Sequence, residues 1–121
     1  MALMKVSDTE LAIEFSGGER TWTRRASLTV PLSAVRRAAR VGDPLRAARG
    51  ARKGLHVSGV AKVGVWGLFR GPRQLVAAYR GQPGLHIELD RAAAGGEFDE
   101  LVLSLADAEQ LARRVGQGRN R

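Results

Sequence analysis

Short segments in which apolar and polar residues alternate recur along most of this chain. In residues 10–15, Leu11, Ile13 and Phe15 fall on one face, and the same period of two continues in residues 26–32. Further apolar or alternating segments follow at 60–69, 74–79, 85–90 and 101–105. A period of two places successive side chains on opposite faces of a strand, so the pattern predicts six or seven short β-strands.

Glycine and proline residues separate these predicted strands. Residues 16–18 form a turn cluster after the first strand, and residues 81–84 form another between two later strands. Pro31 has no N–H to donate to a ladder, so its strand lies at a sheet edge or ends there. The glycines between residues 59 and 71 indicate a strongly bent strand or tight turns. Strands at this spacing are typical of an antiparallel sandwich or barrel.

Residues 31–54 leave two interpretations open. Residues 35–41 alternate well enough for a strand, although Arg37 then lies on the apolar face, and their Ala and Arg content also suits a helix. Residues 43–50 begin with Asp-Pro and end with Gly, which are helix start and stop signals. Much of residues 42–58 is rich in glycine and cations, and we expect it to be a mobile loop because it can bury little.

The last part of the chain predicts an amphipathic helix. Asp107 and Gln110 have the capping-box spacing, and Gly116 is expected to end the helix. The apolar stripe that would face the core consists of Ala108, Leu111 and Val115. We therefore expect a single domain over residues 1–116 and a disordered tail over residues 117–121.

Three phrases of the sequence resemble the small bacterial pleckstrin-homology-like (PH-like) domains of actinobacteria. They are VPLSAV at 30–35, GVWGLF at 64–69 and LVLSLADAE at 101–109. The resemblance covers roughly residues 5 to 115. It implies a mostly β, PH-like bent antiparallel sandwich or open barrel of six to seven strands with one C-terminal helix. It also implies that residues 35–41 form a strand.

PH-like domains in general bind partners and do not catalyse reactions, so the resemblance implies a binding role. In lipid-binding members a basic cluster in the first hairpin loop holds phosphate groups. Arg20, Arg24 and Arg25 occupy the comparable place in this chain.

Composition narrows the function classes. The chain has 121 residues, two His and no Cys, which excludes a disulfide scaffold, a thiol nucleophile and a thiolate zinc site. A metal cage would have to rely on carboxylates, and we expect neither a metal nor another cofactor. No secretory signal and no apolar run of about 20 residues is visible, which predicts a cytoplasmic protein, peripheral to a membrane at most.

Positive charge is concentrated in one stretch. Residues 20–53 hold ten of the 20 Lys and Arg residues and a single acid, Asp43. Arg presents a planar fork that can hold two phosphate oxygens, so we interpret the stretch as a surface for anions. The alternative is a solvated face in an Arg-rich protein. The predicted anion-binding residues are Arg20, Arg24, Arg25, Arg36, Arg40, Arg46, Arg49, Arg52 and Lys53.

Other candidate sites are weaker. Trp22 could stack on a base or lie at a membrane interface, but a Trp beside a strand is more often part of the core. His86 lies on the polar face of its strand beside Glu88, which predicts a surface residue. The cluster Glu97, Asp99 and Glu100 is expected to be a solvated turn. No spacing typical of a catalytic triad or a phosphate loop is present, which argues against an enzyme.

These observations predict a non-enzymatic binding or scaffold module with a cationic face, whose partner is an anionic membrane surface or an acidic protein. The alternative is a nucleic-acid-binding protein that uses the basic segment 33–54. Exposed edge strands would also allow homo-oligomerisation.

Overall fold

The computed structural model describes residues 1–119 and places nine β-strands in two sheets. The small sheet is antiparallel and contains, in spatial order, β1 (Leu3–Val6), β2 (Glu10–Glu14) and β3 (Ser27–Pro31). The large sheet contains, in spatial order, β4 (Val35–Val41), β8 (Gly84–Leu89), β9 (Glu100–Ser104), β7 (Gln74–Tyr79), β6 (Ala61–Trp66) and β5 (Arg52–Val57).

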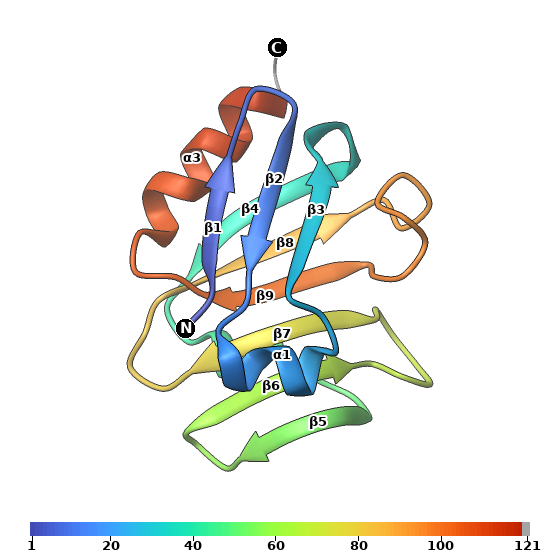
Figure 1. Ribbon diagram of the computed structural model, residues 1–121, viewed down its shortest axis with the longest axis vertical. Coiled ribbons are helices and arrows are strands. Elements are labelled where there is room, and N and C mark those ends of the chain that lie inside the picture. Colours follow the sequence, from blue (N-terminus) through green and yellow to red (C-terminus); the bar gives the residue numbers. More distant parts are fainter. Residues whose placement is uncertain (120–121) are drawn as a thin grey trace.

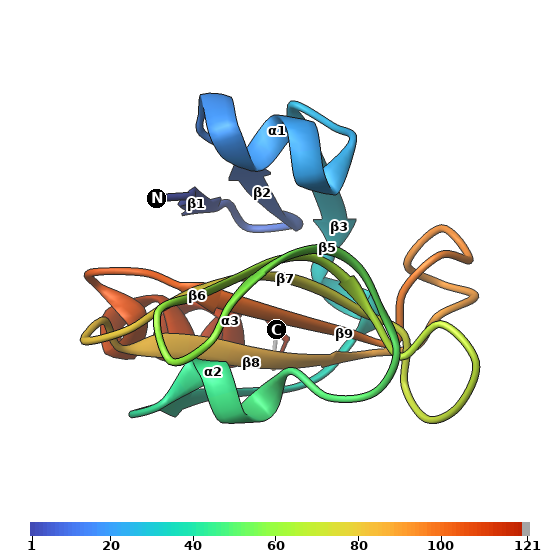
Figure 2. The same ribbon diagram turned by 90° about the horizontal axis from the view of Figure 1, so that it is seen from below.

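The two sheets form layers. Figure 1 shows the small sheet in front of the large one, with its strands running across the strands behind it. Figure 2 shows helix α1 (Gly17–Thr23) on the same side of the large sheet as the small sheet, and the one-turn helix α2 (Pro44–Ala47) on the opposite side. We call these two sides of the large sheet the inner face and the outer face.

Both faces of the large sheet are buried around β9. All five residues of β9 are buried. Leu101 and Leu103 point into the main core between the sheets, whereas Val102 packs on the outer face with Trp66 and Val76 under the α2 segment. The mostly β, sandwich-like architecture predicted from the sequence is confirmed, and it is consistent with a PH-like fold.

The strands differ from the expectation in their number and in their pairing. Nine strands are present where six or seven were expected, because the short β1 and the edge strand β5 lack a clear period of two. In addition, β7 and β9 pair in parallel, whereas every other neighbouring pair is antiparallel. Pro31 ends β3 at the edge of the small sheet, as its missing N–H predicted.

The ambiguous segment 31–54 contains a strand, a helical turn and part of a second strand. Residues 35–41 form β4, so the helical interpretation of these residues is wrong. The Asp-Pro start signal is correct but yields only the four residues of α2. The expectation of a loop over residues 42–58 is also wrong, because β5 occupies 52–57 and pairs with β6.

The glycines of β5 and β6 permit a close approach of the two strands. Gly54 and Gly64 face each other in the ladder, and a Cβ atom at Gly64 would lie 2.7 Å from the Gly54 Cα. Gly64 also has a φ of 140°, a conformation that glycine adopts at little cost. The close approach of β5 and β6 therefore explains these two glycines.

Helix α3 (Ala108–Arg119) packs beside β1 and β4, at one side of the gap between the sheets (Figure 1). Ala108, Leu111 and Val115 are buried, as the apolar stripe predicted. The expected end at Gly116 is wrong, since the helix continues through residues 117–119 of the predicted tail. The rest of that tail, residues 120–121, lies outside the described residues.

Within residues 1–119, none of the helices combines the length and the hydrophobicity that crossing a bilayer would require.

Replacement of Leu111 by Ala tests whether α3 belongs to the core. Leu111 is 4% exposed, so we expect the change to lower the free energy of unfolding by about 2–4 kcal/mol. Urea denaturation of both proteins measures this difference. Arg113→Ala, on the exposed side of the same helix, is the control and should change stability by less than about 0.5 kcal/mol. Equal effects of the two changes would contradict the packing of α3.

Candidate anion-binding site

Helix α1 replaces the hairpin loop expected between β2 and β3. Its start at Ser16 is fixed because the Glu19 Oε1 atom accepts a hydrogen bond of 2.9 Å from the Ser16 backbone N–H, which is half of a capping box. Glu19 is only 2% exposed and turns inward, where its Oε2 atom lies 4.0 Å from the N-terminal ammonium group of Met1. Nothing in the sequence indicated this burial, because an acid beside two glycines is typical of an exposed turn.

The buried Glu19 carboxylate also anchors α1 to the large sheet. The Tyr79 hydroxyl, at the end of β7, donates a hydrogen bond to the second carboxylate oxygen, Oε2. Burial and the adjacent carboxylate raise the pKa of Tyr79 well above its usual range. The contact holds the helix over β5, β6 and β7 (Figure 1).

Arg24 and Arg25 follow the helix and differ in how they are held. Arg24 has φ 60° and ψ 31°, the left-handed conformation that glycine or Asn normally adopts after a helix. Arg25 is held by an ion pair of 2.7 Å with Glu97, and its guanidinium lies 5.0 Å from the ring centroid of Phe98. The hydrogen bond from Arg25 lowers the pKa of Glu97. Arg25 is therefore fixed in place, whereas Arg24 is exposed.

These residues border a pocket of about 300 Å³ between α1, the large sheet and the loop before β9. Its walls combine apolar and cationic side chains. They include Trp22, Val65, Leu68 and Phe98 on the apolar side, and Arg24, Arg25, Lys53 and Arg73 on the cationic side. The one acid in the wall is Glu97. We call this site the cationic pocket.

Three of the four cations of the cationic pocket are available to a ligand. Arg25 is occupied by Glu97, but within residues 1–119 the side chains of Arg24, Lys53 and Arg73 make no hydrogen bond or ion pair. Positive groups that converge on a partly apolar hollow concentrate the positive potential there, and Arg and Lys can donate charge-assisted hydrogen bonds to an anion. The pocket therefore has the composition of an anion site.

A protruding loop, residues 67–73, continues the surface beside the cationic pocket. Leu68 and Arg73 line the pocket, and between them Phe69 is 85% exposed and Arg70 is exposed. The base of the loop is tight, because a Cβ atom at Gly67 would lie 1.9 Å from the Pro72 carbonyl oxygen. The loop thus presents a large apolar side chain to solvent from a constrained base.

The nine predicted anion-binding residues do not form one patch. Because β4 and β5 are the opposite edges of the large sheet, cations on these two strands lie far apart. Arg24, Arg25 and Lys53 line the cationic pocket, and Arg20 lies on the adjacent α1. Arg36 and Arg40 lie on β4, Arg46 and Arg49 on the outer face in and after α2, and Arg52 on β5. Arg73 was missed because it lies outside the basic stretch.

Two aromatic residues also differ from expectation. Trp22 is 42% exposed and not part of the core, because it lies on a helix and not beside a strand. Phe69 was expected within a buried bent strand, but β6 ends at Trp66. Their exposure changes the character of the site, since both are close to its cations.

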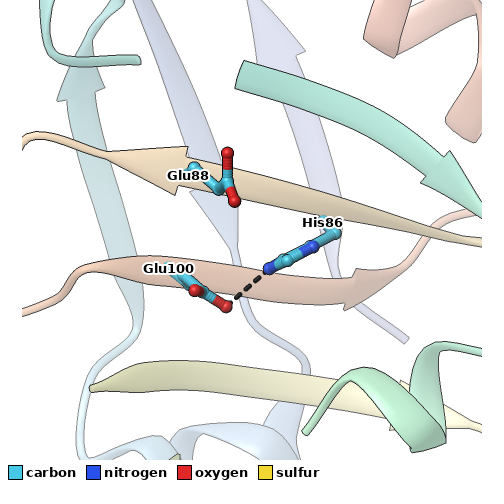
Figure 3. Close-up of side chains that lie close together, drawn as sticks. All are labelled: His86, Glu88 and Glu100. Atoms are coloured by element: carbon cyan, nitrogen blue, oxygen red, sulfur yellow. Dashed lines mark hydrogen bonds and ion pairs between the residues drawn. The ribbon is translucent and has the colours of Figure 1, made fainter. Parts of the chain in front are cut away.

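A second constellation lies on the outer face of the large sheet. His86 and Glu88 project from β8 and Glu100 from β9, and one ligand atom of each lies within 4.8 Å of the others (Figure 3). The His86 Nε2 atom is 2.5 Å from the Glu100 Oε1 atom. Imidazole nitrogen and carboxylate oxygen are atoms that bind divalent metals.

The sequence had assigned these residues to the surface. His86 is half-buried, with 25% of its side chain exposed, and Glu100 is buried within β9 and does not belong to a solvated turn. Asp99 pairs with Arg91, whose hydrogen bond lowers the pKa of Asp99. Only Glu97 remains exposed. The three acids of the expected turn therefore lie in three different environments.

Comparisons of the chain with protein-family models, with curated proteins and with solved structures gave no match. The function is therefore inferred from the geometry of the two sites.

Tyr79→Phe tests the anchor of α1. The change leaves one oxygen of the buried Glu19 without its hydroxyl partner, so we expect a loss of about 1–3 kcal/mol in the free energy of unfolding at pH 7. Because the folded protein raises the pKa of Tyr79 above 10.0, the contribution of Tyr79 is present below pH 10 and declines as the pH rises further. The difference between the two proteins should therefore shrink above pH 10. A constant difference up to pH 11.5 would contradict this.

Arg24→Gly separates backbone strain from charge at the cationic pocket. Glycine adopts a φ of 60° without steric cost, so the variant should be as stable as the wild type or more stable by up to about 1 kcal/mol. Arg24→Asn provides a second residue that tolerates this conformation. Urea midpoints measure the effect. A clear destabilisation by both changes would show that the Arg24 side chain contributes to folding and is not free for a ligand.

Proposed function

We propose that this protein is a non-enzymatic, peripheral binding module for anionic membrane surfaces, and that it docks through the cationic pocket and the loop 67–73. The observation that carries the proposal is the exposure of Trp22 and Phe69 close to Arg and Lys side chains that make no hydrogen bond or ion pair within residues 1–119.

The exposed aromatic residues fit the interface of a bilayer. A Trp side chain has an apolar body and a polar N–H, and such side chains favour the headgroup region. Phe69, at 85% exposure, places a large apolar group in water, and inserting it among acyl chains would recover up to about 2–3 kcal/mol. Its place at the tip of a protruding loop allows insertion without rearrangement of the sheets.

The charges fit lipid headgroups. Each Lys or Arg near an anionic leaflet contributes about 1 kcal/mol of attraction. Arg24, Lys53 and Arg73 line the cationic pocket together with Trp22, and Arg70 follows Phe69 in the loop. The formal net charge of the chain is +8. The attraction is screened over about 8–10 Å at physiological salt, so cations close to the docking surface contribute more than those on β4.

The alternative of nucleic-acid binding required segment 33–54 to act as one basic surface. The structure divides this segment between β4 at one edge of the large sheet, α2 on the outer face and β5 at the other edge. Nucleic-acid binding is therefore an outcome to be distinguished by experiment and not the function that we propose.

Vesicle sedimentation tests the proposal. We expect the wild type to bind vesicles that contain phosphatidylglycerol, to bind phosphatidylcholine vesicles weakly, and to dissociate as salt is raised. Replacing Arg24, Lys53 and Arg73 together by Gln should weaken binding about 100-fold, and Phe69→Ala about tenfold. Tryptophan fluorescence should shift to shorter wavelength on binding, and this shift reports Trp22 because Trp66 is only 3% exposed.

The matched control replaces Arg37, Arg40 and Arg46 together by Gln, which removes the same charge from exposed positions outside the cationic pocket. This variant should retain most of the binding. An equal loss in both triple variants would replace the specific site by a general effect of net charge. Tight binding of duplex DNA or RNA without binding of vesicles would favour the nucleic-acid alternative, and inhibition by free inorganic phosphate would indicate a soluble anion as ligand.

A further inference from the structure

We infer that His86, Glu88 and Glu100 form a binding site for one divalent metal ion of the zinc class on the outer face of the large sheet. This site is independent of the cationic pocket. It does not depend on the proposed membrane binding.

The sheet register brings the three side chains together. His86 and Glu88 are two residues apart on β8, so both point to the outer face. Glu100 lies directly opposite Glu88 in the antiparallel ladder of β8 and β9. The ligand atoms therefore come from two adjacent, hydrogen-bonded strands, which hold their backbones at fixed positions (Figure 3).

The spacing of the ligand atoms suits a metal. Zinc–ligand bonds of about 2.0–2.2 Å in a tetrahedral site place ligand atoms about 3.3–3.6 Å from one another. The three atoms of this cluster lie within 4.8 Å of each other, and the closest pair, His86 Nε2 and Glu100 Oε1, is at 2.5 Å. Small side-chain rotations would bring all three to bonding distance of a common centre.

Within residues 1–119, neither Glu88 nor Glu100 has a Lys or Arg partner closer than 4.0 Å. The half-buried Glu88 makes no hydrogen bond or ion pair, although Arg37 lies opposite it in the ladder of β4 and β8 and Arg36 lines the adjoining hollow. Glu100 is 7% exposed, and its nearest cationic partner is the Arg49 guanidinium at the ion-pair limit of 4.0 Å. Two carboxylates held this close repel each other, and a cation between them removes the repulsion. The imidazole supplies a nitrogen ligand that favours zinc over calcium.

The surroundings orient the cluster and leave it accessible. The Gln74 side-chain amide donates a hydrogen bond of 3.0 Å to Glu100 Oε1 and is itself fixed to the backbone of residues 47 and 49. A hollow of about 430 Å³, lined by both Glu88 and Glu100, provides a path for entry. Arg49 has 66% of its side chain exposed and can turn away into solvent. Three protein ligands leave a fourth position for water.

Metal titration tests the inference on untagged protein that has been dialysed against EDTA. We expect one Zn²⁺ to bind per chain by isothermal titration calorimetry, and Co²⁺ to show the visible absorption of a four-coordinate complex. His86→Gln and Glu88→Gln should each weaken binding at least about tenfold, since even the loss of a residue that only orients a ligand has such an effect. Zn²⁺ should also raise the melting temperature of the wild type but not of these variants.

His56→Gln is the matched control, because His56 is the second His of the chain and lies on β5, outside the cluster. It should bind Zn²⁺ as the wild type does. Glu88→Gln is expected to fold normally because Glu88 has no partner to lose, and far-UV circular dichroism checks this. The absence of saturable binding at one equivalent would overturn the inference. An equal loss in the His56→Gln variant would overturn it as well, because Zn²⁺ would then bind exposed imidazoles without a built site.

Discussion

The burial of β9 on both faces is the constraint on which the rest of the structure depends. Its inner residues, Leu101 and Leu103, require the small sheet and α3 as a cover. Its outer residue Val102 requires a second cover, which the α2 segment provides. A strand at the edge of the sheet would not be covered on both faces in this way. β9 accordingly lies inside the sheet, between β7 and β8. Its polar residues must then find partners inside the protein, and Ser104 does so by accepting the backbone N–H of Tyr79 at 2.9 Å.

The need to cover Val102 also explains the position of the α2 segment, which has only one helical turn. The α2 segment packs Leu45, Ala47 and Ala48 against this face, and hydrogen bonds also hold it there. The Lys62 ammonium group donates to the carbonyl oxygens of residues 45 and 48, and Gln74 bonds to residues 47 and 49. Because Gln74 also orients Glu100, the cover of the core and the proposed metal site share one side chain. Packing and site geometry are thus coupled on this face.

Apolar patterns in the sequence were sufficient for strands that are buried on one face or on both, and insufficient elsewhere. Residues 74–79 were predicted with their observed bounds because all of them except Gln74 form one apolar run. β5 was missed because Lys53, Gly54 and His56 interrupt any alternation in an edge strand whose residues are all exposed or half-buried. The pairing of Glu88 with Glu100 depends on register between strands that are separate in the sequence, which local patterns do not encode. Trp22 was assigned to the core for a related reason, since the seven-residue α1 contains two glycines and has weak helix propensity.

The distribution of charge follows from where the acids are used. Glu19 is buried under α1, Glu97 fixes Arg25, and Asp99 fixes Arg91, so these acids serve the fold and do not neutralise the surface. Among residues 1–119, the cations that make no ion pair therefore dominate the surface potential, and three of them, Arg24, Lys53 and Arg73, line a partly apolar hollow. The proposed metal site lies on the opposite face of the same sheet from α1. The charge of a bound divalent ion would be screened over about 8–10 Å in physiological salt. The metal site and the cationic pocket should therefore act independently of each other.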